Sequence, residues 1–133
     1  MNKSVLRTGL DNHKLNKVEH QVKFLPHDIL KSFGKLKKSG PFDLIIVDPP
    51  SFQKGSFVLT KDYRKILRRL PELCNNGSQL LLCANSPEVS ESEFRAMIEE
   101  GTNGKLRFSH RLAAAPRFEE PKGANLKALV YNV

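Results

Sequence analysis

Three shortages in this sequence each exclude a class of protein. Its 133 residues include two cysteines, Cys74 and Cys83, which have neither the number nor the spacing of a disulfide framework or a zinc site. No apolar run approaches the roughly 18–20 residues that a membrane helix needs, and the charged first residues lack the apolar region of a signal peptide. We therefore expect a cytoplasmic protein without disulfides.

Acidic residues are the third shortage. Asp and Glu together number 14 against 22 Lys and Arg, so the formal net charge at pH 7 is +8, and the isoelectric point is near 9.7. This excess favours a polyanionic partner or an anionic surface. The histidines are scattered without the paired spacing of metal ligands, so we expect no metal site; they are His13, His20, His27 and His110.

Apolar runs and helical periodicities alternate along the chain. They predict strands at residues 22–25, 44–47, 79–84, 106–112 and 126–131, and helices at 4–16, 28–36, 59–73 and 91–100. Residues 51–58 are expected to form a loop, and 75–77 to end the third helix. The alternation predicts one α/β domain over residues 1–133 with a mainly parallel sheet, in which the last two strands form an antiparallel pair.

The segment Phe42 to Phe52, with the sequence FDLIIVDPPSF, is the most informative part of the chain. Its β-branched apolar run predicts a strand buried on both faces, and the carboxyl end of such a strand is where α/β folds bind ligands. Pro49 and Pro50 cannot donate hydrogen bonds, so the strand must stop with its carbonyls free. Asp48, these carbonyls and the Phe52 ring suit a planar group that carries an amine. The alternative interpretation is a turn in which Asp48 caps a helix.

The predicted helix after this segment has two different faces. Lys61, Arg64, Lys65 and Arg68 follow the i, i+3, i+4, i+7 spacing of one helical face, opposite an apolar stripe. Such a face could follow the phosphates of a nucleic acid, and Lys54 in the preceding loop would extend it. A solvated helix face explains the same pattern. A second basic cluster, Lys31, Lys35, Lys37 and Lys38, has less clear facial order.

Several of these segments resemble a known family. The matching stretches are DNHKLN at residues 11–16, His27-Asp28 after a strand, D-P-P-S-F at 48–52, Lys61-Asp62-Tyr63 through Leu70, and LKALVY at 126–131. Together they are similar to class I S-adenosylmethionine-dependent methyltransferases, specifically to the bacterial large-subunit ribosomal RNA base methyltransferases. The resemblance implies a Rossmann-like sheet of seven strands. We expect this chain to carry the last five, as a truncated catalytic domain or as one completed by a partner chain or a dimer.

The resemblance also assigns roles to residues. It implies cofactor contacts from His27, Asp28 and Asp48, with Asp28 meeting the adenine amino group or, alternatively, capping the next helix. It implies that Asp48, Pro49, Pro50 and Phe52 hold the target amine, although Ser51 separates Phe52 from the prolines where the commoner motif has the aromatic next to them.

Carbon is the other possible acceptor, and it would require a cysteine nucleophile such as Cys83. Cys83 lies in an apolar strand, and related carbon methyltransferases have their cysteine where this chain has Asn85. We therefore favour transfer to a nitrogen of a ribosomal RNA base, with S-adenosylmethionine as cofactor. A noncatalytic RNA-binding or scaffold fragment is the alternative. Methylation of a protein amide or a small molecule is a third hypothesis.

Overall fold

The computed structural model describes residues 3–55, 57–113 and 126–133. The chain divides into two compact units, Met1–Lys35 and Leu36–Val133. Among the described residues, no helix is long and apolar enough to cross a lipid bilayer.

The first unit is built around one aromatic ring. Its elements are α1 (Lys3–Leu15), η1 (Glu19–Gln21), η2 (Ile29–Lys31) and the beginning of α2 (Phe33–Ser39). The ring of Phe24 meets His13 of α1 edge-on, with centroids 5.2 Å apart at 89°. A Cβ on Gly9 would lie only 3.0 Å from Phe24 Cζ. Gly9 weakens the helix by its propensity, but it lets this ring approach.

Two predictions in the first unit are wrong. Residues 22–25 form no strand, because no neighbouring strand among the described residues pairs with their backbone. The helix predicted at 28–36 is divided into η2 and α2. Asp28 is the N-cap residue of η2, and its side chain accepts a hydrogen bond from the Leu30 N–H at 2.9 Å.

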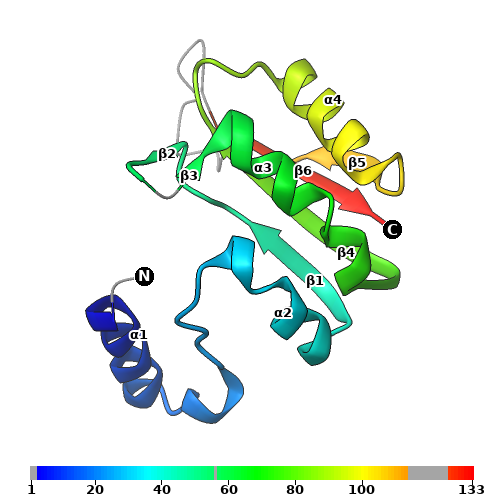
Figure 1. Cartoon of the computed structure of the whole chain (residues 1–133). Helices are drawn as coiled ribbons and strands as arrows, with labels where there is room; N and C mark the ends of the chain where they lie inside the picture. Colours follow the sequence, from blue (N-terminus) through cyan, green and yellow to red (C-terminus); the bar gives the residue numbers. More distant parts are fainter. Residues whose placement is uncertain (1–2, 56, 114–125) are drawn as a thin grey trace. The chain divides into compact units, whose positions relative to one another are not determined.

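The second unit contains a four-stranded sheet in the order β1-β4-β6-β5 (Figure 1). The strands are β1 (Phe42–Val47), β4 (Cys74–Asn85), β5 (Arg107–Arg111) and β6 (Leu126–Asn132). β1 and β4 are parallel, whereas β6 is antiparallel to both β4 and β5. The α/β fold and the antiparallel pairing of the last two strands are therefore confirmed. Because β6 enters between β4 and β5, one of the pairings in this described sheet is parallel and the others are antiparallel.

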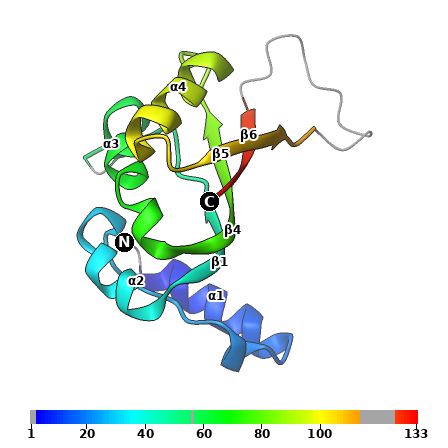
Figure 2. The ribbon, with the colours of Figure 1, turned by 90° about the vertical axis from the view of Figure 1, so that its right-hand side faces the viewer.

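Helices α3 (Leu59–Leu67) and α4 (Glu91–Thr102) lie together on one face of this sheet (Figure 2). The fully buried side chains between helices and sheet include Leu67, Phe94 and Ile98 from the helices and Leu80, Leu82 and Leu129 from the strands. The predicted helix 59–73 ends at Leu67 and continues as η3 (Leu70–Leu73). Residues 75–77 lie inside β4 instead of ending the helix, and Gly77 there has a φ of +86°.

β1 is not buried on both faces, as its apolar run predicted. Leu44 and Ile46 are 57% and 60% exposed, whereas Leu80 and Leu82 on the neighbouring strand are fully buried. The register pairs Ile45 with Leu80, so Leu44 and Ile46 point to the face opposite the one that α3 and α4 cover. β1 is also an edge strand in the described sheet, which leaves its apolar residues with fewer neighbours.

Candidate functional site

The site begins where β1 and β4 end side by side. Val47, the last residue of β1, is paired with Leu82, and β4 continues to Asn85. Asp48 and Pro50 are exposed, and Pro49 is half-buried. The Asp48 carboxylate has no hydrogen-bond or ion-pair partner among the described residues. It caps no helix there, since α3 begins at Leu59 and Val58 is its N-cap residue. We call Asp48, Pro49 and Pro50 the acceptor rim.

Tyr63 on α3, which the sequence placed in the motif Lys61-Asp62-Tyr63 without a role of its own, supports the acceptor rim through the end of β1. Its side chain is fully buried and meets the Phe94 ring edge-on at 5.2 Å. Its hydroxyl donates to the Val47 carbonyl at 3.3 Å. Burial, with the charges of Cys83 and Asp48 nearby, raises the pKa of Tyr63 well above its usual value. The hydroxyl therefore remains a donor that holds the end of β1.

A pocket of about 270 Å³ opens beside the rim. Part of its wall is a hairpin of β2 (Phe52–Gln53) and β3 (Phe57–Val58), where a loop was predicted. Gly55 lies in the turn, and its φ of +73° is a backbone conformation that favours glycine. The side chain of Phe52 is 67% exposed. The pocket is lined by Ser51, Phe52, Val58, Leu59, Thr60, Ser86, Pro87 and Glu88.

Two hydrogen bonds fasten this hairpin to α3. The Leu59 N–H donates to the Ser51 carbonyl at 3.0 Å. The Asp62 carboxylate accepts from the Val58 N–H at 2.8 Å and pairs with Lys65 at 2.7 Å. The hydrogen bond from Lys65, and after it the one from Val58, lowers the pKa of Asp62. The hairpin is therefore tied to the helix that also carries Tyr63.

A buried lysine supports the pocket wall that Ser86 forms, and this role was not predicted from the sequence. Lys127 lies on β6, is 7% exposed, and donates from Nζ to the carbonyl of Ser86. The Ser86 hydroxyl in turn accepts from the Glu88 N–H at 3.3 Å. Burial, and then the charge of Arg111, lowers the pKa of Lys127. An apolar strand position carrying a lysine was the only sequence signal for this contact.

Cys83 is close to the rim but is buried, with 7% of its surface exposed. Burial and the nearby charge of Asp48 raise the pKa of its thiol. Since the thiolate is the reactive form, a raised pKa makes Cys83 a poor nucleophile.

The two other predicted cofactor residues belong to the first unit. The Asp28 side chain caps η2 through Leu30, so the capping interpretation is confirmed, and its cofactor role stays a prediction. His27 Nε2 lies 3.0 Å from Nζ of Lys35, which donates because a lysine has no acceptor.

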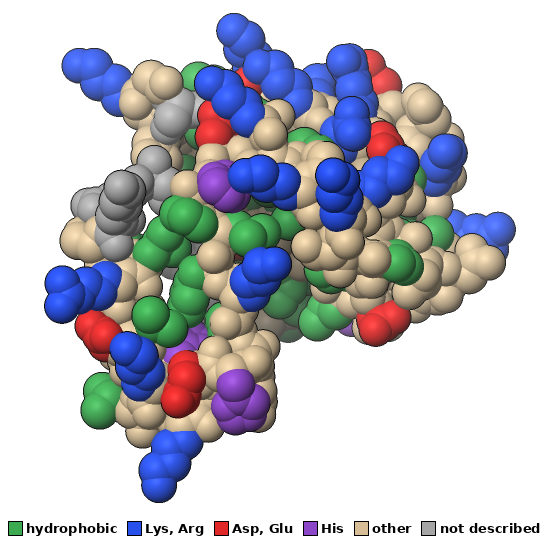
Figure 3. Space-filling model, turned by 60° about the horizontal axis from the view of Figure 1, so that its bottom comes forward, with side chains coloured by type: hydrophobic (Ala, Val, Ile, Leu, Met, Phe, Trp, Pro, Cys, Tyr) green, Lys and Arg blue, Asp and Glu red, His purple; other side chains and the backbone are tan. Residues whose placement is uncertain are grey.

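The predicted basic face of α3 is only partly available. Arg64 forms an ion pair with Glu100, and Lys65 forms one with Asp62. Lys61 and Arg68 are exposed, as is Lys54 at the tip of the hairpin, and their side chains form no ion pair or hydrogen bond with the described residues, although the charge of Lys61 contributes to the lowered pKa of Asp62. Basic side chains are more frequent than acidic ones on the face shown in Figure 3. Within the described part of the chain, no group of three His, Cys, Asp or Glu residues could hold a metal ion.

Comparison with known proteins agrees with this architecture. YwbD of Bacillus subtilis (strain 168), provisionally named a ribosomal RNA large subunit methyltransferase, is 30% identical over 105 aligned residues, and the match covers 74% of this chain and 26% of YwbD. The crystal structure of SMU.776, provisionally described as a methyltransferase and complexed with SAH, is 25% identical with a TM-score of 0.65. A provisionally named S-adenosylmethionine-dependent methyltransferase from Streptococcus mutans is 24% identical with a TM-score of 0.68.

Each of these two structures is matched over 80% of this chain and 30% of its own chain. The chain thus spans about a third or less of the length of the relatives it resembles. The family model described as S-adenosylmethionine-dependent methyltransferase matches residues 1–132. Because this match extends over almost every residue, the chain belongs to the S-adenosylmethionine-dependent methyltransferases.

Proposed function

We propose that this chain forms the target-binding part of an enzyme that methylates a nitrogen of a ribosomal RNA base, with S-adenosylmethionine as the methyl donor. The observation that carries the proposal is the 270 Å³ pocket, lined by the exposed Phe52 ring, beside the unpartnered carboxylate of Asp48. Exposed aromatic rings stack on nucleobases, and carboxylate and carbonyl oxygens accept hydrogen bonds from an amino group.

The residues of the rim fit the cofactor in their chemistry. When bound, S-adenosylmethionine supplies an electrophilic methyl group on a positively charged sulfur. The exposed carboxylate of Asp48 complements that positive charge. His27 and Asp28, in the first unit, are proposed to contact its adenine.

The acceptor rim would act by orientation. Asp48 and the carbonyls near Pro49 and Pro50 take the hydrogens of the target amine, so that its lone pair faces the methyl carbon. The cofactor would supply the methyl group and its sulfur would keep the carbon–sulfur electron pair, while the target nitrogen would give up a proton to solvent. Tyr63 keeps the rim in place through Val47. Such positioning supplies much of the rate in reactions that bring two bound groups together.

Nitrogen is preferred to carbon as the acceptor because of Cys83. A carbon acceptor on a pyrimidine needs a thiolate that adds to the ring. The described residues near the rim offer Cys83, which is buried and has a raised pKa. We therefore expect Cys83→Ala to keep methyl transfer within about threefold of the unsubstituted chain, as for a residue that only packs.

RNA is the proposed partner because the unpaired cations lie close to the pocket. Lys61 follows the pocket residues Leu59 and Thr60 on α3, and Lys54 is at the tip of the hairpin that carries Phe52. A protein amide or a small molecule would not need these cations. Binding that weakens steeply with salt would therefore favour RNA over these acceptors.

The test is transfer of labelled methyl groups from S-adenosylmethionine to unmodified, in-vitro-transcribed large-subunit ribosomal RNA. We expect Asp48→Ala to reduce transfer by about 100-fold or more through lost positioning, with RNA affinity unchanged. Phe52→Ala should raise the RNA concentration needed for half-maximal rate and leave cofactor binding, measured by calorimetry, unaltered. The control is Asp43→Ala, an exposed carboxylate at the other end of β1.

Each possible result bears on the proposal. Equal loss in Asp48→Ala and Asp43→Ala would contradict the role of the rim. RNA binding with no transfer and no cofactor binding by the unsubstituted chain would overturn the enzymatic part, leaving a noncatalytic RNA-binding fragment. Transfer to protein in preference to RNA would overturn the substrate.

A further inference from the structure

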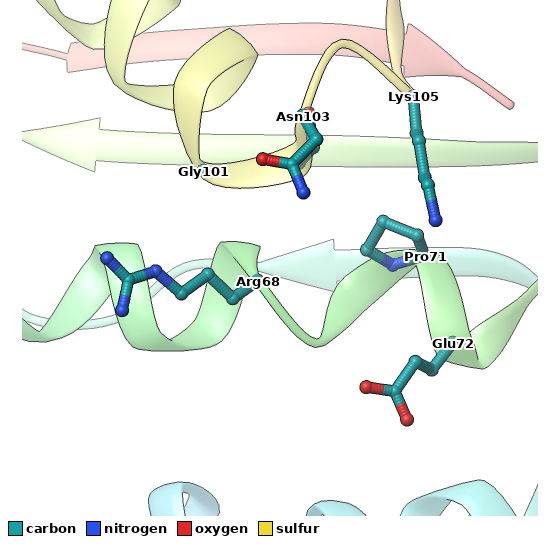
Figure 4. Close-up of a pocket in the computed structure, with 7 residues that line it drawn as sticks. Arg68, Pro71, Glu72, Gly101, Asn103 and Lys105 are labelled. Carbon is teal, nitrogen blue, oxygen red and sulfur yellow. The ribbon is translucent and has the colours of Figure 1, made fainter.

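A second cavity lies at the other end of α3 from the acceptor rim. It is a groove of about 350 Å³ between the end of α3, η3 and the turn that follows α4 (Figure 4). Its lining includes Arg68, Pro71, Glu72, Gly101, Asn103 and Lys105. α3 begins beside the target pocket and its nine residues extend for about 14 Å. The groove is thus a separate site that lies about one helix length from the pocket.

The groove has an excess of positive charge. Arg68 and Lys105 are exposed, and neither side chain has an acidic or hydrogen-bond partner among the described residues. The acidic residue in the lining, Glu72, is already neutralised, since Lys37 lies 3.2 Å and Arg69 3.0 Å from its carboxylate. The two unpaired cations are therefore available to an anion.

The directions of the side chains favour an extended anion over a compact one. Arg68 extends along α3 toward one end of the groove, whereas Lys105 descends toward Pro71 at the other end (Figure 4). The side chain of Asn103 points into the space between the two rows of residues (Figure 4). The two cations thus point to different parts of the groove (Figure 4). A chain with repeated negative charges could contact both, with the Asn103 amide as an additional donor.

The other cations of α3 connect this groove to the pocket. Lys61 and Arg68 are seven positions apart, about 10 Å along the helix. Arg64 and Lys65, which lie between them, are engaged by Glu100 and Asp62. The unpaired positive charge is therefore at the two ends of the helix, one beside the pocket and one in the groove.

We propose that this groove binds the sugar–phosphate backbone of the same RNA strand whose base enters the target pocket, at nucleotides flanking the target. The inference rests on the proposed function for the identity of the anion. Arg68 and Lys105 contact phosphates, which fixes the register of the strand without reading its sequence. Because phosphates are the same at every nucleotide, we expect the groove to accept any base sequence at these flanking positions.

The test uses the whole chain, labelled with ¹⁵N, and a single-stranded RNA of ten nucleotides. We expect amide shifts at Asn103, Gly104 and Lys105 as well as at the pocket residues Phe52 and Ser86. The double substitution Arg68→Gln and Lys105→Gln should abolish the first set and keep the second. It should also make the dependence of log affinity on log salt less steep by about 1.4, the value for two phosphate contacts on a single strand.

The matched control is Arg107→Gln. Arg107 is an exposed residue of β5 outside the groove lining, without an ion-pair partner among the described residues. It should leave the shifts and the salt slope unchanged. An equal effect of both variants would overturn the groove as a defined site.

The outcomes separate this inference from the proposed function. Shifts confined to the pocket would overturn the groove and leave the target site standing. Shifts confined to the groove would support a backbone site and count against the target pocket. No shift at either place would overturn both. Equal groove shifts with a decamer of glutamate would overturn the assignment to phosphates.

Discussion

Gly101→Ala tests how closely α3 and α4 pack on the sheet. Gly101 is buried in the last turn of α4. A Cβ placed there would lie 2.7 Å from Cβ and 3.0 Å from Cδ1 of Leu67, which is fully buried in α3. Carbon atoms need about 3.5–4.0 Å, so the two helices would have to separate locally by roughly 1 Å. The Leu67 Cβ cannot rotate away, because it is bonded directly to the backbone.

Two effects of opposite sign decide the magnitude. Alanine in place of glycine inside a helix favours folding by up to about 1 kcal/mol. Overpacking a well-packed contact costs about 1–3 kcal/mol, and a clash with a Cβ belongs to the upper part of that range. We therefore expect the free energy of unfolding to fall by about 1–2 kcal/mol, or about 3–8 °C in the melting temperature of a chain of this length.

The assay is urea unfolding followed by circular dichroism, with Gly34→Ala as the matched control. A Cβ on Gly34, in α2, would meet nothing within 4 Å, so only the helix propensity acts and stability should rise slightly or stay level. If Gly101→Ala proved as stable as the unsubstituted chain, the close approach of α3 and α4 would be refuted.

Three further predictions concern the supports of the site. Tyr63→Phe removes the donor to the Val47 carbonyl but keeps the ring packing, so urea unfolding should show a loss of about 0.5–1 kcal/mol. Asp62 has a lowered pKa in the folded state, so its stabilisation is present above its unfolded pKa of about 3.9 and is lost as the pH falls through the lower folded value. Asp62→Asn should therefore flatten the fall in the urea midpoint between about pH 5 and 2. Lys127→Met frees the Ser86 carbonyl, and amide hydrogen exchange at the pocket wall should accelerate.

Each of these predictions has a result that would contradict it. Unchanged stability in Tyr63→Phe would mean that water replaces the hydroxyl at the Val47 carbonyl. A pH profile of Asp62→Asn that overlays the original would show that the ion pair with Lys65 is not formed in solution. Exchange in Lys127→Met that rises equally throughout the sheet would indicate general destabilisation in place of a loosened wall.

Local patterns in the chain predicted much of the fold. The helix predicted at 91–100 is observed as Glu91–Thr102, and a capping box begins it, in which Ser90 and Glu93 bond to each other's backbone N–H. The strand that ends at Val47 follows from its β-branched run and from the two prolines after Asp48. These signals operate between residues a few positions apart, so they are legible without knowledge of the rest of the chain.

Two of the wrong predictions share one cause, which is that the expected distant partner is missing among the described residues. Residues 22–25 have the composition of a strand but no neighbouring strand among the described residues. Leu44 and Ile46 have the composition of a core but lie on the face that α3 and α4 leave uncovered. Composition measures a residue's tendency to be buried, whereas burial itself requires another element at that place.

By itself, the sequence determined most of the helices and strands, the end of β1 before Asp48, and the family whose motifs the chain resembles. Only the tertiary structure decided that β6 enters between β4 and β5, that Glu100 neutralises Arg64 from 36 positions away, and that Lys127 supports Ser86 across 41 positions. Helix and strand preferences are set by neighbours in the chain. Strand order, ion pairs and buried polar contacts depend on which distant surfaces meet, and the packing of the whole unit decides that.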